Sequence, residues 1–139
     1  MMNEPVSSIM TAAEKLITCK PEDSMVTAQR TMEKHRLHHL PIVSEGKLRG
    51  LITTTDLLRL NRRFDEYSSM DVKDVMTTKL AKLEPQAKVG TAATIFLENL
   101  FHLLPIVDKQ DNLQGIITTF DVLKYNFQKA YPGDTFPFQ

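Results

Sequence analysis

Two copies of a threonine–aspartate pair are the residues best suited to bind a ligand. Thr53 precedes Asp56 by three positions, and Thr118 precedes Asp121 by the same spacing. Apolar residues come just before each threonine, so each pair is expected where a strand passes into a helix. A carboxylate there can accept hydrogen bonds from both hydroxyls of a ribose, and the helix N-terminus favours an anion. The simpler interpretation stays open: the four residues only cap helices and satisfy strand ends.

Histidines offer a second kind of chemistry. His35 and His38 are spaced i, i+3, which can place two imidazoles on one helical face, and His39 follows directly. The spacing crosses the predicted helix end before Pro41, which favours a helix-terminus cation for His35 or His38 and a packed ring for His39. No Ser-His-Asp or Cys-His arrangement stands out, and Cys19 is expected to fill space in a strand. A metal-dependent enzyme therefore stays an alternative hypothesis without an assigned catalytic residue.

The elements that carry these residues are repeated. Pro105 follows Pro41 by 64 positions, and Asp121 follows Asp56 by 65. A period of this length indicates a complete small α/β unit in each copy. A unit of about 60 residues buries too little surface to be stable alone, so the two units are expected to share a core.

Hydrophobic periodicity and turn residues predict the same order of elements in both units, a β-α-β-β-α unit after a short turn. In the first unit the expected elements are a turn or helix over 4–11, strands over 16–19, 40–43 and 48–52, and helices over 24–36 and 57–67. In the second they are strands over 80–83, 104–107 and 113–117 and helices over 89–100 and 122–130. The predicted divisions are 4–68, 69–131 and a C-terminal tail, 132–139, expected either to dock on a neighbour or to fray.

The repeated strings resemble the cystathionine-beta-synthase-type domain, the CBS domain, which occurs in tandem pairs. They are HLPIV (39–43) with GLITTTD (50–56), and LLPIV (103–107) with GIITTFD (115–121), preceded by IMT (9–11) and VMT (75–77). The resemblance implies an α/β fold of two repeated β-α-β-β-α CBS units packed as a pseudo-twofold pair with two clefts between them. It also implies dimerisation into a flat disc, no catalysis, and regulatory binding of AMP, ADP, ATP or S-adenosylmethionine.

The family pattern places the ribose contacts at the two threonines and two aspartates named above. Residues of the predicted hairpins are expected to line the clefts against an adenine: Pro41, Ile42, Pro105 and Ile106. Thr18 stands where the family often has a hydroxyl residue near the base, and the second unit has Lys82 there, whose ammonium could reach a phosphate. Family members often place Arg or Lys just before the aspartate, whereas Thr55 and Phe120 stand here. This departure favours a ligand with little phosphate, and we expect the first cleft to bind it rather than the second.

The amino-acid composition limits the classes of binding partner that are expected. The 139 residues suit one soluble domain, with 42% apolar and 24% charged residues. Basic and acidic residues balance at 17 each without a basic stripe, which excludes nucleic acid as a first hypothesis. No apolar run approaches the ~20 residues of a membrane span, so no membrane insertion is expected. The single cysteine suits a reducing, cytoplasmic setting.

The sequence therefore predicts a regulatory module, not an enzyme, that senses an adenosine-containing ligand and requires no cofactor. It is expected to form a homodimer and to signal to an unidentified regulated protein. The main alternative is a structural dimerisation or interaction module whose clefts stay empty.

Overall fold

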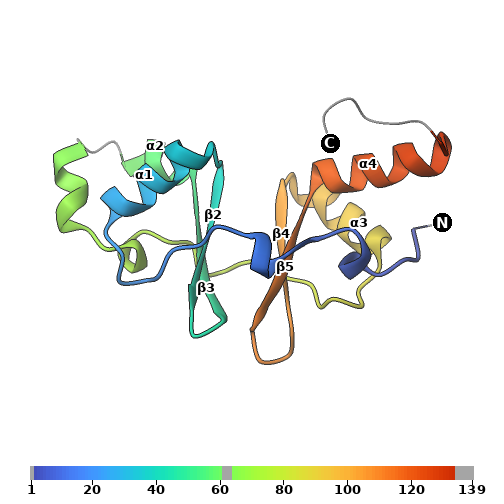
Figure 1. Ribbon diagram of the computed structural model, residues 1–139, viewed down its shortest axis with the longest axis horizontal. Coiled ribbons are helices and arrows are strands. Elements are labelled where there is room, and N and C mark those ends of the chain that lie inside the picture. Colours follow the sequence, from blue (N-terminus) through green and yellow to red (C-terminus); the bar gives the residue numbers. More distant parts are fainter. Residues whose placement is uncertain (1, 61–63, 134–139) are drawn as a thin grey trace.

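The protein is described by a computed structural model that covers residues 2–60 and 64–133. Its elements form two units, each with a two-stranded hairpin and two helices (Figure 1). The first unit contains α1 (Met25–His35), β2 (His39–Ser44), β3 (Lys47–Thr53) and α2 (Thr54–Leu60). The second contains α3 (Val89–Asn99), β4 (Leu103–Val107), β5 (Leu113–Thr118) and α4 (Thr119–Ala130). A short strand, β1 (Thr11–Ala12), and 3-10 helices over Val6–Ser8, Ala13–Lys15, Phe64–Ser69 and Val72–Asp74 complete the description.

The helices begin where short polar side chains can cap them. Ser24 caps α1, since its Oγ accepts a hydrogen bond from the Thr27 N–H at 3.1 Å. The buried face of α1 carries Met25, Ala28 and Met32, as the apolar spacing predicts. The predicted start of this helix is therefore confirmed. Within the described residues no helix is long and apolar enough to cross a membrane.

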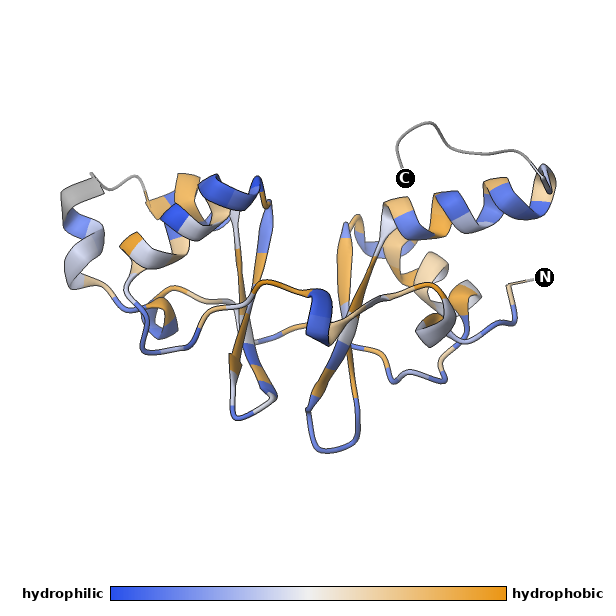
Figure 2. Cartoon of the chain, viewed as in Figure 1, coloured by the Kyte–Doolittle hydropathy of each residue, from blue (hydrophilic) through white to orange (hydrophobic). Residues whose placement is uncertain are grey.

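Each hairpin separates its apolar side chains onto two faces. In β2, Leu40 and Ile42 are fully buried against the helices of their own unit. Side chains alternate along a strand, so His39 and Pro41 lie on the opposite face, paired with Thr53 and Leu51 of β3. Figure 2 shows apolar residues along the strands and polar residues in the turns. The second face of each hairpin is thus turned towards the other unit.

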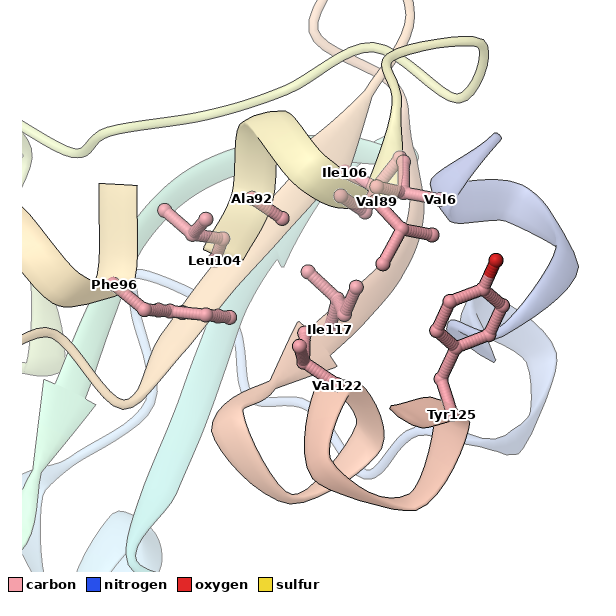
Figure 3. Packing of buried hydrophobic residues seen from close by; sticks show 9 residues of the cluster. All are labelled: Val6, Val89, Ala92, Phe96, Leu104, Ile106, Ile117, Val122 and Tyr125. Carbon is pink, nitrogen blue, oxygen red and sulfur yellow. The ribbon is translucent and has the colours of Figure 1, made fainter. Parts of the chain in front are cut away.

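The second unit repeats this packing. Figure 3 shows Leu104 and Ile106 of β4 and Ile117 of β5 within a cluster that α3 and α4 complete. The register of its hairpin matches the first, with Leu103 opposite Thr118. Both hairpins shift register by one residue near their turns, after Ile42 and Ile106.

The strand predicted at the start of each unit is reduced to a single bridge. Cys19 pairs with Ile42 in the first unit, and Leu83 pairs with Ile106 in the second, both in parallel orientation. A proline follows two positions later in each unit. Because proline has no N–H to donate, the ladder does not extend beyond these bridges.

The segment that precedes each unit packs on the other unit. Val6 is fully buried beside Val89 in the second core (Figure 3), and Thr11 of β1 pairs with Ile116 of β5. Conversely, Val72 is fully buried in the first core. The predicted boundary between 68 and 69 follows the repeat in the sequence. In the structure, the segment that precedes each unit packs against the core of the other unit.

The hairpin turns join the two units. The Leu48 N–H donates to the Asp111 carbonyl, and the Leu113 N–H donates to the Gly46 carbonyl, each at 2.9 Å. Leu48, Leu113 and Val107 form a small core between the units. This contact closes one end of the interface, and the threonine–aspartate pairs follow the opposite ends of β3 and β5.

Candidate ligand-binding cleft

Thr53 and Asp56 hold each other at the junction of β3 and α2. The Asp56 N–H donates to Thr53 Oγ1 at 3.2 Å, and the Thr53 N–H donates to Asp56 Oδ2 at 2.9 Å. This reciprocal pair satisfies backbone groups at the helix start, so the two residues do cap α2, and their ligand-binding role stays a prediction. Within residues 2–60 and 64–133, Asp56 Oδ1 accepts no hydrogen bond. That oxygen remains able to accept one from a ligand.

Thr118 and Asp121 repeat the geometry with one difference. The backbone bonds are equivalent, at 3.2 Å to Thr118 Oγ1 and 2.8 Å to Asp121 Oδ2. In addition the Thr118 hydroxyl donates to Asp121 Oδ2 at 3.0 Å. The Thr53 hydroxyl makes no such bond among the described residues, so its proton is available to a ligand, whereas that of Thr118 is used internally.

A cleft of about 180 Å³ lies beside Thr53 and Asp56, and both units contribute to its wall. Besides this pair, the first unit supplies Leu51. The segment that leads into the second unit supplies Thr77, Lys79, Leu80 and Ala81, and Thr77 pairs with Leu51 of β3. Strand β4 and the residue before it supply Leu103, Pro105 and Phe101. The cleft thus combines hydrogen-bonding groups from one unit with a mainly apolar surface from the other.

Several residues expected at the clefts lie elsewhere. Ile42 and Ile106 are 0% exposed within the two cores, so their side chains do not line a cleft. The error is one of strand alternation, since only every second residue faces the other unit. Lys82 points to the β4–β5 turn, where its Nζ lies 3.1 Å from Asp111 Oδ1. Thr18 is exposed and is not among the described residues that line the Asp56 cleft.

The prolines follow the expected alternation. Pro105 lines the Asp56 cleft, and Pro41 occupies the repeated position in β2, where it is buried. Sequence reasoning missed Lys79 and Phe101 because it grouped candidate residues within each unit. The period of the repeat does not indicate that residues far apart in the two repeats line the same cleft.

His39 lies near the pair as a packed ring. It is opposite Thr53 in the hairpin register and half-buried. Burial lowers the pKa of the His39 imidazole below its usual value, and the nearby His38 and His102 lower it further. Within the described residues, no group of three or more His, Cys, Asp or Glu side chains could hold a metal ion.

Comparisons with known proteins agree with this architecture. The CBS domain profile matches residues 6–63 and 72–127. The chain is 31% identical to uncharacterized protein MJ1225 of Methanocaldococcus jannaschii, covering 88% of this chain and 47% of that relative. It is 32% identical to inosine-5'-monophosphate dehydrogenase of Korarchaeum cryptofilum, covering 86% of this chain and 24% of the relative. The chain therefore spans about half or less of the length of these relatives.

Solved structures with similar folds cover the whole pair of units. The crystal structure of CBSX2 from Arabidopsis thaliana matches with a TM-score of 0.83 at 26% identity, covering 92% of this chain and 97% of that one. The structure of CBSX2 in complex with AMP matches with a TM-score of 0.81 at 26% identity, covering 91% and 98%. With two matched copies of the profile and the paired α/β architecture, the chain belongs to the CBS domain family and is a tandem CBS pair.

Proposed function

We propose that this CBS pair is a regulatory module that binds an adenosine-containing ligand in the cleft between its units. The observation that carries the proposal is the Asp56 cleft, which Thr53 and Asp56 line together with apolar residues, and where Asp56 Oδ1 accepts no hydrogen bond from the described residues. The carboxylate suits a ribose diol, and the apolar wall suits a flat base. The complex of the similar protein CBSX2 with AMP supports this class of ligand.

Binding in this cleft would couple to the arrangement of the two units. Because both units form its wall, a ligand bridges them and favours the arrangement that fits it. The size of the effect equals the difference in the ligand's affinity for the two arrangements. We propose that an unidentified partner protein in the cytoplasm responds to this change, and that the pair has no catalytic activity of its own.

Ligand binding is tested by thermal shift with AMP, ADP, ATP and S-adenosylmethionine, followed by titration calorimetry. A ligand at 100 times its dissociation constant adds about 2.7 kcal/mol to the free energy of unfolding, which raises the melting midpoint by several degrees. We expect a shift with adenosine compounds, and a loss of affinity in Asp56→Asn. An unshifted midpoint with every compound would refute the proposal and favour the structural module with empty clefts.

An exposed apolar surface on the second unit favours a homodimer as well. Leu97 of α3 is 80% exposed and Leu123 of α4 is 66% exposed, and both line a groove between these helices. At 64 positions before Leu97, the first unit has Glu33. Exposed leucines gathered at one place are typical of an interface.

Homodimerisation is tested by light scattering on the eluting protein. We expect a dimer for the parent chain and a monomer for Leu97→Glu. The matched control is Lys73→Glu, an exposed position that does not line this groove. A parent chain that elutes as a monomer at every concentration would remove the homodimer from the proposal.

A further inference from the structure

A groove lies between the two helices of each unit, and the two grooves occupy repeated positions of the chain. The groove between α3 and α4 has a volume of about 250 Å³, and the groove between α1 and α2 has about 450 Å³. The lining positions that repeat are Gln29 and Ala93, Met32 and Phe96, Glu33 and Leu97, Thr54 and Thr119, and Leu57 and Val122. The two grooves therefore share one backbone arrangement and differ in their side chains.

The groove of the second unit continues into an exposed apolar surface. Leu97 lines the groove, and Leu100, which follows α3, is 82% exposed. On α4, Phe120, Leu123 and Phe127 follow one another at spacings of three and four, which places them on one side of the helix (Figure 2). The second unit thus presents a continuous apolar surface that α3 and α4 share.

The corresponding surface of the first unit carries two charges. Glu33 stands where the second unit has Leu97, and Arg36 stands where it has Leu100. Both are exposed and line the first groove, and within residues 2–60 and 64–133 neither side chain makes an ion pair. Positions three apart lie on the same side of a helix. The acid and the base are therefore neighbours at the end of α1, and each can accept a partner from another molecule.

We infer that two copies of this chain associate like with like, the second unit against the second unit and the first against the first. This inference rests on the homodimer proposed above and adds its arrangement. Around a twofold axis, a contact of residue i with the partner's residue j is repeated as a contact of j with i. The apolar surfaces then cover each other, and Glu33 of each copy pairs with Arg36 of the other.

The opposite arrangement, first unit against second, conflicts with these side chains. Because the repeated positions are equivalent, it would bring the same helices together with Glu33 and Arg36 against the leucines of the second unit. Charges buried against an apolar surface without a partner are costly. The difference between the two units therefore selects the arrangement.

The arrangement is tested by cross-linking of cysteine variants. Leu58 of α2 and Leu123 of α4 are 65 positions apart in the repeat and both exposed, so Leu58→Cys and Leu123→Cys place thiols at equivalent sites. The reagent is a bismaleimide that spans about 10 Å, the distance between packed helices. We expect Leu123→Cys to cross-link to itself, and a re-equilibrated mixture, with one variant size-tagged, to give no product between the two variants. The parent chain is the control for Cys19, which is buried.

A charge exchange tests the contact between the two first units. Glu33→Arg should raise the dissociation constant of the dimer about tenfold, because two pairs of like charge replace two pairs of opposite charge. The double variant Glu33→Arg with Arg36→Glu should restore the parent value within about twofold, since both copies exchange their charges. Lys34→Glu is the matched control, because Lys34 is exposed on the same helix and does not line the groove. Light scattering over a dilution series measures these constants.

The outcomes separate this inference from the proposals on which it rests. A product between Leu58→Cys and Leu123→Cys, or a dimer of Leu123→Cys that does not cross-link to itself, would overturn the arrangement and leave the homodimer intact. A double variant as weak as Glu33→Arg would also overturn it. A parent chain that is monomeric at every concentration would overturn the inference and the homodimer, but not ligand binding. Melting midpoints within one or two degrees of the parent, roughly, would show that the variants fold.

Discussion

The two oxygens of the Asp56 carboxylate differ in their hydrogen bonding. Its Oδ2 accepts the Thr53 N–H at 2.9 Å, and within the described residues its Oδ1 accepts nothing. One oxygen thus fixes the start of α2, and the same side chain lines the cleft. Capping and ligand binding are therefore compatible roles of one side chain, and substitutions can separate them.

Two substitutions of Asp56 should have different effects. Asp56→Asn retains an oxygen for the Thr53 N–H, so the free energy of unfolding should change little while nucleotide affinity falls about tenfold or more, because the charge is lost. Asp56→Ala should lose that affinity and also about 1 kcal/mol of stability, because the helix start loses its partner. Chemical denaturation and calorimetry measure the two quantities. Parent-like AMP affinity in Asp56→Asn would remove this residue from the site.

The two threonines form a matched pair for a second prediction. Thr53→Val and Thr118→Val should each lose about 1 kcal/mol of stability, because each hydroxyl accepts the N–H of its aspartate at 3.2 Å. Only Thr53→Val should weaken the ligand of the Asp56 cleft. Calorimetry on both variants checks this, and a larger loss of affinity in Thr118→Val would instead assign the ligand to the other cleft.

The N-terminal segment is held on α4 by an acid-sensitive contact. Glu4 Oε1 lies 2.8 Å from Lys129 Nζ, and the Tyr125 hydroxyl donates to the same carboxylate. The Lys129 contact first, and the Tyr125 bond second, lower the pKa of Glu4 from 4.5 to about 2. A group whose pKa is lower in the folded state stabilises that state above its unfolded pKa. This contribution should be complete above pH 4.5 and lost as the pH falls towards 2.

Glu4→Gln is the variant that tests this pH dependence. It should reduce the slope of stability against pH between 4.5 and 2 and leave the slope above this range unchanged. Denaturant midpoints at several pH values in this window measure the slope. Because Glu4 and Lys129 are at the surface, high salt should also reduce this slope in the parent chain, but by less than the substitution does. Identical acid slopes for the two proteins would contradict the assignment.

Gly115 allows the leading segment to approach β5 closely. A Cβ at Gly115 would lie 2.4 Å from the Thr11 carbonyl oxygen, and a Cβ at Gly50 would lie 2.9 Å from that of Thr77. A backbone oxygen cannot move aside as a flexible side chain can, so strand β1 would have to shift. We expect Gly115→Ala to cost about 1–3 kcal/mol and Gly50→Ala to cost less. Thermal unfolding of both variants checks the order, which would be refuted by an unchanged midpoint in Gly115→Ala.

The sequence by itself determined the features that depend on neighbouring residues. The repeated strings predict two hairpins and two pairs of helices, and a cap at Asp23 or Ser24 predicts the start of α1, where Ser24 is the capping residue. The threonine–aspartate pairs were also predicted at strand ends, because the apolar run and the capping residues are adjacent in the chain. The helix expected from Leu57 begins at Thr54, since Thr53 rather than Asp56 precedes its first turn. The C-terminal tail, 132–139, was predicted either to dock on a neighbour or to fray. Residues 134–139 lie outside the described part of the chain.

Only the tertiary structure decided which residues share a cleft. Asp56 lines one cleft together with Lys79 of the segment between the units and Phe101 of the second unit, because the hairpins are joined at their turns. Ile42 was placed in a cleft by its motif, but strand alternation and register turn it into the core. A repeated sequence determines what each unit contains, whereas contacts between units depend on how two surfaces pack, which no local pattern specifies.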